Sequence, residues 1–173
     1  AERFLELVVA PRFSAEALAR LTRKKNLRVL SVQLPVFAAV TRGRLRAFGR
    51  LALHQDEDEG FPELATWRAV AGAEPDAATR RALTLAWTVV KHGKSNAIVL
   101  ASSDATLGVG FGQMSRVDSV KLAIRKAGEQ GLDLAGCAAA SDGFFPFPDG
   151  IEELARAGVR AVVAPGGSIR DDE

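Results

Sequence analysis

The chain has 173 residues, which is enough for one domain with a buried core. Hydrophobic residues make up 47% and charged residues 25%, so the composition is that of a folded globular protein and excludes a disordered chain. No apolar run approaches the ~20 residues of a membrane-spanning helix, and residues 1–10 lack the order of a signal peptide. We therefore expect a cytoplasmic protein with no membrane partner.

The charge balance argues against a nucleic-acid partner, because 23 Lys and Arg against 21 Asp and Glu leave a net charge of only +2. Residues 1–50 nevertheless hold eleven basic and three acidic residues, which form either a solvated face or a surface that steers an anionic ligand. One cysteine and two histidines exclude both an intramolecular disulfide framework and a Cys/His zinc set, so we expect no metal site.

The first third of the chain predicts a strand, a helix and a strand. Residues 4–10 are rich in β-formers, Ser14 opens an Ala/Leu-rich helix to Leu21, and residues 27–34 form the second strand. This order is typical of α/β layer architectures. Residues 45–54 look like one amphipathic strand, which an acidic turn follows.

A helix with Pro75 in its first turn is predicted to run to Lys91. Residues 97–101 and 106–111 flank a short polar turn and predict paired strands. The helix after them begins at Ser115, in a capping-box spacing, and continues to about Lys126.

The last part of the chain predicts two more strands and a helix. Gly128 and Gly131 break the helix before them, and residues 137–141 form a short strand. Asp149, with Glu152, caps a helix that Gly158 ends. The last predicted strand covers residues 159–164.

Three segments at strand ends or helix starts are candidates for chemistry, because such edges bind ligands in α/β sheets: residues 94–96, 108–118 and 141–150. The glycines at 108, 110 and 112 do not fit a dinucleotide fingerprint, since Gln113 stands at the next motif position. They either let the backbone approach a ligand, with Ser115 and Arg116 facing an anion, or fit a crowded strand.

The loop at residues 144–148 holds three phenylalanines and two prolines. Its rings are either buried in the hydrophobic core or line a slot for a heteroaromatic ring, with Asp142 and Asp149 as polar contacts. Asn96 is either a turn residue or an amide that orients a carboxamide or stabilises an oxyanion. Residues 165–168 form a plain turn or a backbone nest.

The chain contains four motifs in this order, KSNAIV, GVGFGQMSRVDS, ASDGFFPFPDGI and APGGSIRDDE, and the opening segments FLELVVAP and KKNLRVL. With these motifs it resembles the AICAR transformylase/IMP cyclohydrolase family. The resemblance covers nearly the whole chain. It implies an α/β fold: a cytidine-deaminase-like domain in three α/β/α layers around a mixed sheet. Residues 1–173 would then be a partial AICAR formyltransferase domain, with the IMP cyclohydrolase domain absent.

The resemblance also implies the ligands: the family transfers a formyl group from 10-formyltetrahydrofolate, its folate co-substrate, to the 5-amine of AICAR in purine biosynthesis. The implied AICAR contacts are Glu6, Asn96 and Arg116, and Asn96 is the implied catalytic residue. The implied folate contacts are Val117, Phe144, Pro146, Asp149, Ser168 and Ile169. The family's site lies at the interface of a homodimer.

The chain departs from the family's pattern in several places. Pro148 replaces a usual arginine, and Arg50 stands where Gly-Gly is common. The family's proton-transferring Lys-His pair matches no motif of this chain and belongs upstream of Ala1, and the family's tail lies beyond Glu173. We therefore expect the isolated chain to bind ligands weakly without transferring a formyl group.

Two other functions compete with this interpretation. A zinc nucleoside deaminase needs a His/Cys/Cys site, which one cysteine excludes. A non-catalytic nucleotide- or folate-binding module of the same fold stays open.

Overall fold

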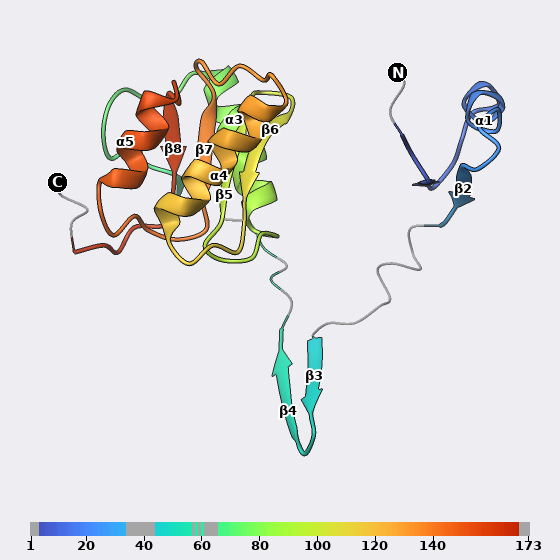
Figure 1. Cartoon of the computed structure of the whole chain (residues 1–173), viewed down its shortest axis with the longest axis horizontal. Coiled ribbons are helices and arrows are strands. Elements are labelled where there is room, and N and C mark those ends of the chain that lie inside the picture. Colours follow the sequence, from blue (N-terminus) through green and yellow to red (C-terminus); the bar gives the residue numbers. More distant parts are fainter. Residues whose placement is uncertain (1–3, 34–43, 57, 59, 61–65, 170–173) are drawn as a thin grey trace. The chain divides into compact units, whose positions relative to one another are not determined.

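The chain divides into two units, residues 1–60 and residues 61–173, which are described separately (Figure 1). The structure, a computed structural model, describes residues 4–33, 44–56, 58, 60 and 66–169. Within these residues no helix is both long and apolar enough to cross a bilayer.

The N-terminal unit begins with the strand-helix-strand that the sequence predicts. β1 (Leu7–Ala10) pairs in parallel with β2 (Arg28–Ser31), and α1 (Ala15–Leu21) connects them. The Ser14 hydroxyl accepts a hydrogen bond from the Ala17 amide at 3.1 Å and so caps α1, as predicted. β2 is shorter than the predicted strand, whose last residue, Leu34, lies outside the described residues.

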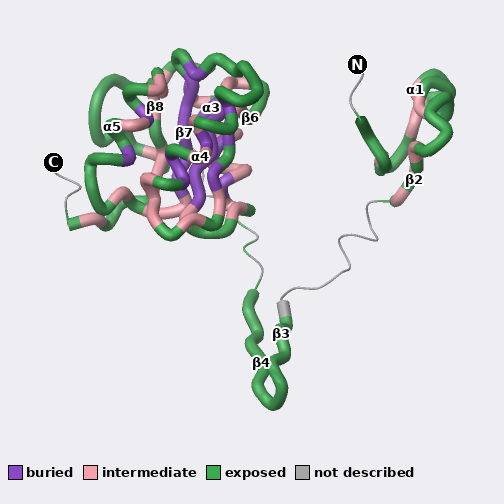
Figure 2. Tube along the Cα trace, in the orientation of Figure 1, coloured by how far each residue is buried: buried purple, intermediate pink, exposed green. Residues whose placement is uncertain are grey.

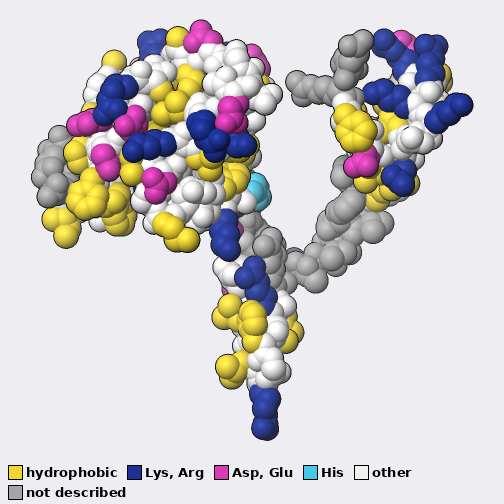
Figure 3. Space-filling model, in the orientation of Figure 1, with side chains coloured by type: hydrophobic (Ala, Val, Ile, Leu, Met, Phe, Trp, Pro, Cys, Tyr) yellow, Lys and Arg dark blue, Asp and Glu magenta, His cyan; other side chains and the backbone are white. Residues whose placement is uncertain are grey.

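The single strand predicted over residues 45–54 is wrong, because this segment forms an antiparallel hairpin. β3 (Arg44–Phe48) pairs with β4 (Leu51–Gln55), and Gly49 at φ 59° lets the chain reverse. Its large apolar side chains are exposed (Figure 3). No residue among 4–33, 45–56, 58 and 60 is buried, so the described core lies in the C-terminal unit (Figure 2).

The C-terminal unit is built on a mixed four-stranded sheet in the order β6-β5-β7-β8. β5 (Ile98–Ala101) runs antiparallel to β6 (Thr106–Gly110) and to β7 (Ala138–Ser141), while β8 (Ala161–Val163) runs parallel to β7. The predicted pairing of residues 97–101 with 106–111 is confirmed.

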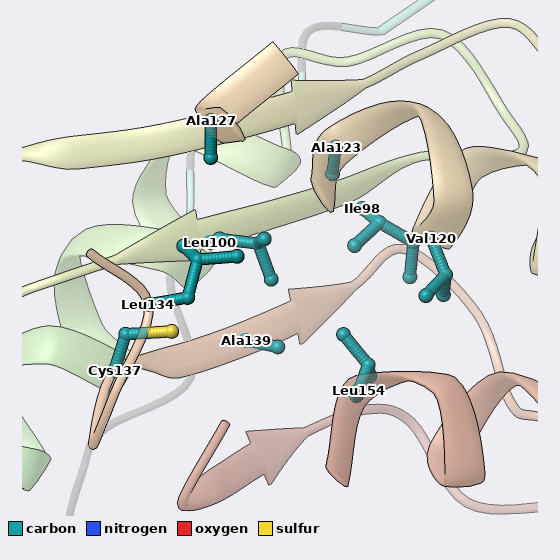
Figure 4. Close-up of a cluster of buried hydrophobic side chains, with 9 residues drawn as sticks. All are labelled: Ile98, Leu100, Val120, Ala123, Ala127, Leu134, Cys137, Ala139 and Leu154. Atoms are coloured by element: carbon teal, nitrogen blue, oxygen red, sulfur yellow. The ribbon is translucent and has the colours of Figure 1, made fainter. Parts of the chain in front are cut away.

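Helices cover both faces of this sheet, which makes three layers (Figure 1). α3 (Ala77–Val90) packs on one face, and α4 (Arg116–Glu129) and α5 (Asp149–Arg156) pack on the other. The alternation of side chains along β5 explains why both faces are covered. Ile98 and Leu100 lie in the cluster under α4 and α5 (Figure 4). Val99 and Ala101 lie in the cluster with α3 on the other face.

The helix ends agree only in part with the predictions. The Ser115 hydroxyl accepts from the Asp118 amide at 3.2 Å, which confirms the predicted cap of α4. Pro75, however, precedes the helix, because the Asp76 carboxylate caps α3 by accepting from the Thr79 amide at 2.8 Å. Gly128 does not break α4, which runs through it to Glu129.

Two glycines of β6 set the distance between α4 and the sheet. A Cβ atom on Gly110 would lie 2.0 Å from the Ser119 carbonyl oxygen, and one on Gly108 would lie 2.2 Å from that of Ala123. The interpretation that these glycines bring backbone close to a ligand is therefore wrong, since the backbone they approach is that of α4. Only glycine permits a helix to lie this close to a strand.

We expect Gly110→Ala to lower the free energy of unfolding by roughly 1–3 kcal/mol, because the added methyl overlaps a helix backbone that cannot yield locally. Urea unfolding followed by fluorescence of Trp67 and Trp87 measures the change in this unit. Gly128→Ala is the matched control, since a Cβ there meets nothing within 4 Å and raises helix propensity. Equal stability of Gly110→Ala and the parent chain would contradict this packing.

Candidate functional site

The strand pairing brings three sequence-distant segments to one edge of the sheet. Ile98, the first residue of β5, pairs with both Gly110 and Ser141, the last residues of β6 and β7. The segment before β5 therefore lies beside the segments that follow β6 and β7. Asn96 comes from the first of these segments, and Arg116 and Asp142 come from the other two.

The guanidinium of Arg116 joins these segments. Its Nη1 donates to Asp142 Oδ1 at 2.6 Å and to Ser141 Oγ at 2.7 Å, and its Nη2 donates to Asn96 Oδ1 at 2.9 Å. The side chains of Arg116 and Asp142 are only 12% and 14% exposed, so water screens their attraction poorly. Hydrogen bonds to ionised groups are also roughly twice as strong as neutral ones.

Asn96 is held from several directions. Its Nδ2 donates to the Gln113 carbonyl at 3.0 Å, and its own carbonyl accepts from the Ser119 hydroxyl at 2.8 Å. With Oδ1 occupied by Arg116, the side-chain amide keeps one N–H and one lone pair for a ligand. It can therefore both donate to and accept from a bound group.

The pKa of Asp142 lies below its usual value. Burial alone would raise it, but hydrogen bonds from Arg116, from the Ser95 hydroxyl and from the Ala97 amide together outweigh burial and favour the charged carboxylate. Asp142 is therefore an anion at neutral pH and balances the charge of Arg116.

A cleft of about 440 Å³ opens beside this network. The residues that line it are Asn96, Met114, Ser115, Arg116, Val117, Gly143, Phe144, Phe145, Pro146, Phe147 and Asp149. Six sequence-predicted site residues are thus brought together: Asn96, Arg116, Val117, Phe144, Pro146 and Asp149.

Three predicted site residues are not among the lining residues. Ser168 and Ile169 follow β8, and Ile169 is fully exposed. Glu6 is exposed in the N-terminal unit, where its carbonyl accepts from the Arg28 amide at 2.9 Å.

The aromatic loop fulfils both of the roles that the sequence left open, at different positions. Phe145 packs against the buried cluster, where its ring would meet a Cβ on Gly150 at 2.9 Å. Phe144 and Phe147 are 43% and 56% exposed and line the cleft. One ring thus anchors the loop while two face outward.

The predicted cap at Asp149 is wrong. Pro148 occupies the N-cap position of α5 without a side-chain hydrogen bond, and Asp149 is the first residue of the helix. The Asp149 carboxylate accepts from the neighbouring Gly150 amide at 2.7 Å. Asp149 also lines the cleft, and a carboxylate can accept further hydrogen bonds from an N–H donor on a ligand.

Two residues of this region have places that the sequence did not predict, Met114 and Asp142. Met114 is 96% exposed on the cleft wall, and its only signal is its place directly before the Ser115 cap. For Asp142 the sequence left open a polar contact in a ligand slot; in the structure Asp142 bonds Arg116 and the Ala97 amide and is not among the lining residues.

Other reactive side chains lie away from the cleft. Cys137 is 4% exposed, and burial raises the pKa of its thiol to about 11, so the thiol stays protonated. Lys91 and His92 follow α3 and are not among the lining residues. In the described part of the chain, no three His, Cys, Asp or Glu side chains form a set for a metal ion.

Comparison with known proteins gives one consistent result. The model of the family described as AICARFT/IMPCHase bienzyme matches residues 1–126. A bifunctional purine biosynthesis protein PurH from Desulfitobacterium hafniense is 51% identical over 170 residues, 98% of this chain and 32% of its own length. The PurH proteins of Chloroflexus aurantiacus and Bacillus thuringiensis are each 49% identical over 172 residues, 99% of this chain and 33% of their own length. The chain thus spans about a third of these curated relatives.

We expect the free energy of unfolding to fall as the pH drops below about 4, because the folded chain binds the Asp142 proton less readily than the unfolded chain does. The charged Asp142 carboxylate stabilises the folded chain above its ordinary pKa of 3.8. This stabilisation is lost as the pH falls through the lower pKa that Asp142 has in the folded chain. Urea unfolding between pH 6 and 3 measures this slope.

Asp142→Asn should be less stable at neutral pH and should show a shallower slope. Some slope remains, because hydrogen bonds from Thr79 also lower the pKa of Asp76. An unchanged slope in Asp142→Asn would show that the carboxylate is not stabilised in the folded chain.

Proposed function

This chain belongs to the AICARFT/IMPCHase bienzyme family, and we propose that it carries part of the formyltransferase site of a purine-biosynthesis enzyme. In this proposal the cleft of the C-terminal unit receives AICAR at its polar end and the pterin of 10-formyltetrahydrofolate along its aromatic wall. Because the chain spans about a third of the length of the curated relatives, we propose ligand binding for this chain and assign turnover to proteins of the relatives' full length.

The observation that carries the proposal is the convergence of the family's implied ligand contacts on one cleft. The implied nucleotide contacts Asn96 and Arg116 line the same cleft as the implied folate contacts Val117, Phe144, Pro146 and Asp149. The two ligands must meet, since the amine has to come within roughly 3–3.5 Å of the formyl carbon.

The polar end suits a carboxamide. Arg116 is already paired with Asp142, so this corner carries no net charge and favours a neutral polar group over a second anion. The free N–H and lone pair of Asn96 match the carbonyl and amine of a carboxamide.

The aromatic lining of the cleft suits a pterin. Phe144 offers an exposed ring beside Pro146, against which a flat heteroaromatic ring can pack. Asp149 provides carboxylate lone pairs for the ring's N–H groups.

The reaction requires a defined proton transfer. The AICAR amine attacks the formyl carbon, a tetrahedral intermediate forms, and the bond from carbon to N10 of the folate breaks. The amine loses one proton and N10 gains one. We assign the stabilisation of the developing oxyanion to the Asn96 amide N–H.

The proton acceptor is assigned to a group beyond the described lining residues. Asp149 is the only carboxylate among them, and they include no imidazole and no lysine amine. A well-placed general base contributes about 10²- to 10⁴-fold to a rate. The exposed Met114 and Phe147 on the cleft wall also support a site completed by a second subunit, in line with the homodimer expected of the family.

We expect this chain to bind AICAR and a folate analogue in isothermal titration calorimetry. Asn96→Ala should lower the affinity for AICAR, and Phe144→Ala should lower the affinity for the folate analogue. Each loss should be roughly tenfold, or about 1.4 kcal/mol. Leu132→Ala is the matched control, because Leu132 is 40% exposed, close to the 43% of Phe144, and does not line the cleft.

Selective losses in these two variants, with the control unchanged, would support the two-part cleft. The proposal fails if neither ligand binds the chain, or if Asn96→Ala and Phe144→Ala bind both ligands as the parent does.

A further inference from the structure

We propose that Asp142 is a positioning residue that fixes the guanidinium of Arg116, and through it the amide of Asn96, so that the cleft selects a carboxamide. This inference rests on the proposed function. It assigns a role to a side chain that does not line the cleft.

Asp142 is tied to the strand that carries Asn96. Its Oδ1 accepts from the Ala97 amide at 2.9 Å, and its own amide donates to the Ala97 carbonyl at 3.2 Å. Ala97 directly follows Asn96, so the carboxylate has a fixed place relative to the Asn96 backbone. Arg116, which bonds both Asp142 and Asn96, is therefore held at two points of one rigid frame.

Ser141 gives the Arg116 guanidinium a further fixed partner. It is fully buried at the end of β7, accepts from Arg116 Nη1 at 2.7 Å and donates to the Gly143 carbonyl at 2.7 Å. A free arginine side chain loses rotamer entropy when it is ordered. Here the protein orders Arg116 before any ligand arrives, which removes that loss from the binding step.

Asp142 also sets the chemical preference of the corner. Without its charge, the guanidinium of Arg116 would attract anions, and the Asn96 amide would lose the partner that is held in place to orient it. When Asp142 is charged, it neutralises Arg116, and the Asn96 amide presents a hydrogen-bond donor in a fixed position. The expected consequence is discrimination for the carboxamide group of the nucleotide rather than for its phosphate.

The test compares AICAR with the matching aminoimidazole ribonucleotide that lacks the carboxamide, by titration calorimetry on this chain. Asp142→Asn should lower the affinity for AICAR by about tenfold, in keeping with the loss of a charge-assisted hydrogen bond. The affinity for the second nucleotide should stay nearly unchanged or rise. Equal weakening of both nucleotides, or no weakening of AICAR, would overturn the inference.

Asp133→Asn is the matched control. The Asp133 carboxylate accepts from the Ala135 amide at 2.9 Å, the same distance as the contact between Asp142 and Ala97, but Asp133 is exposed and does not line the cleft. Its substitution should change neither affinity. Asp142→Glu, which keeps the charge but moves it by one methylene, should restore anion exclusion without restoring full AICAR affinity.

A ligand-free measurement separates this inference from the proposed function. In ¹⁵N NMR spectra the Arg116 Nη groups should give distinct, slowly exchanging signals in the parent chain and averaged signals in Asp142→Asn or Asp142→Glu. Failure of the parent to bind AICAR would refute the proposed function alone. Averaged Arg116 signals in the parent, or distinct signals in a folded Asp142→Asn variant, would refute the positioning role.

Discussion

The ion pair between Arg116 and Asp142 is the interaction on which the arrangement of the cleft depends. Both side chains are largely removed from water, so each ion needs the other to offset its desolvation. Because Arg116 also bonds Asn96, one guanidinium connects the start of β5, the start of α4 and the end of β7. Removal of either charge leaves the other partly buried without its partner, which is the costly case for such pairs.

The backbone makes this pair attainable. The antiparallel pairing of β5 with both β6 and β7 collects three segments at one sheet edge, and the absence of side chains at Gly108 and Gly110 lets α4 lie against β6. Arg116 is the first residue of that helix, so the depth at which α4 packs determines where its guanidinium lies. Glycines with no side-chain chemistry of their own thus help to place the charged group that lines the cleft.

Local sequence patterns predicted the elements better than they predicted the site. Strand pairing in the C-terminal unit and the caps at Ser14 and Ser115 depend on neighbours a few residues away, and they were correct. The pairing of Asp142 with Arg116 could not be predicted from such patterns, because Arg116 lies 26 positions earlier and only the fold brings them together. Residue type alone could not tell Phe144 from Phe145, since it does not say which ring points inward; only the family resemblance singled out Phe144. The hairpin in the first unit was missed because Gly49 lacked a typical two-residue turn partner.

A double-mutant cycle on unfolding free energy tests the central claim most directly. Arg116→Gln, Asp142→Asn and the double variant are compared with the parent chain by urea unfolding at neutral pH. If the pair holds the site segments together, the two substitutions are coupled by about 0.5–3 kcal/mol, and the double variant is less destabilised than the sum of the single variants. Additive losses, within about 0.3–0.5 kcal/mol, would show that Arg116 and Asp142 act independently and would contradict this account.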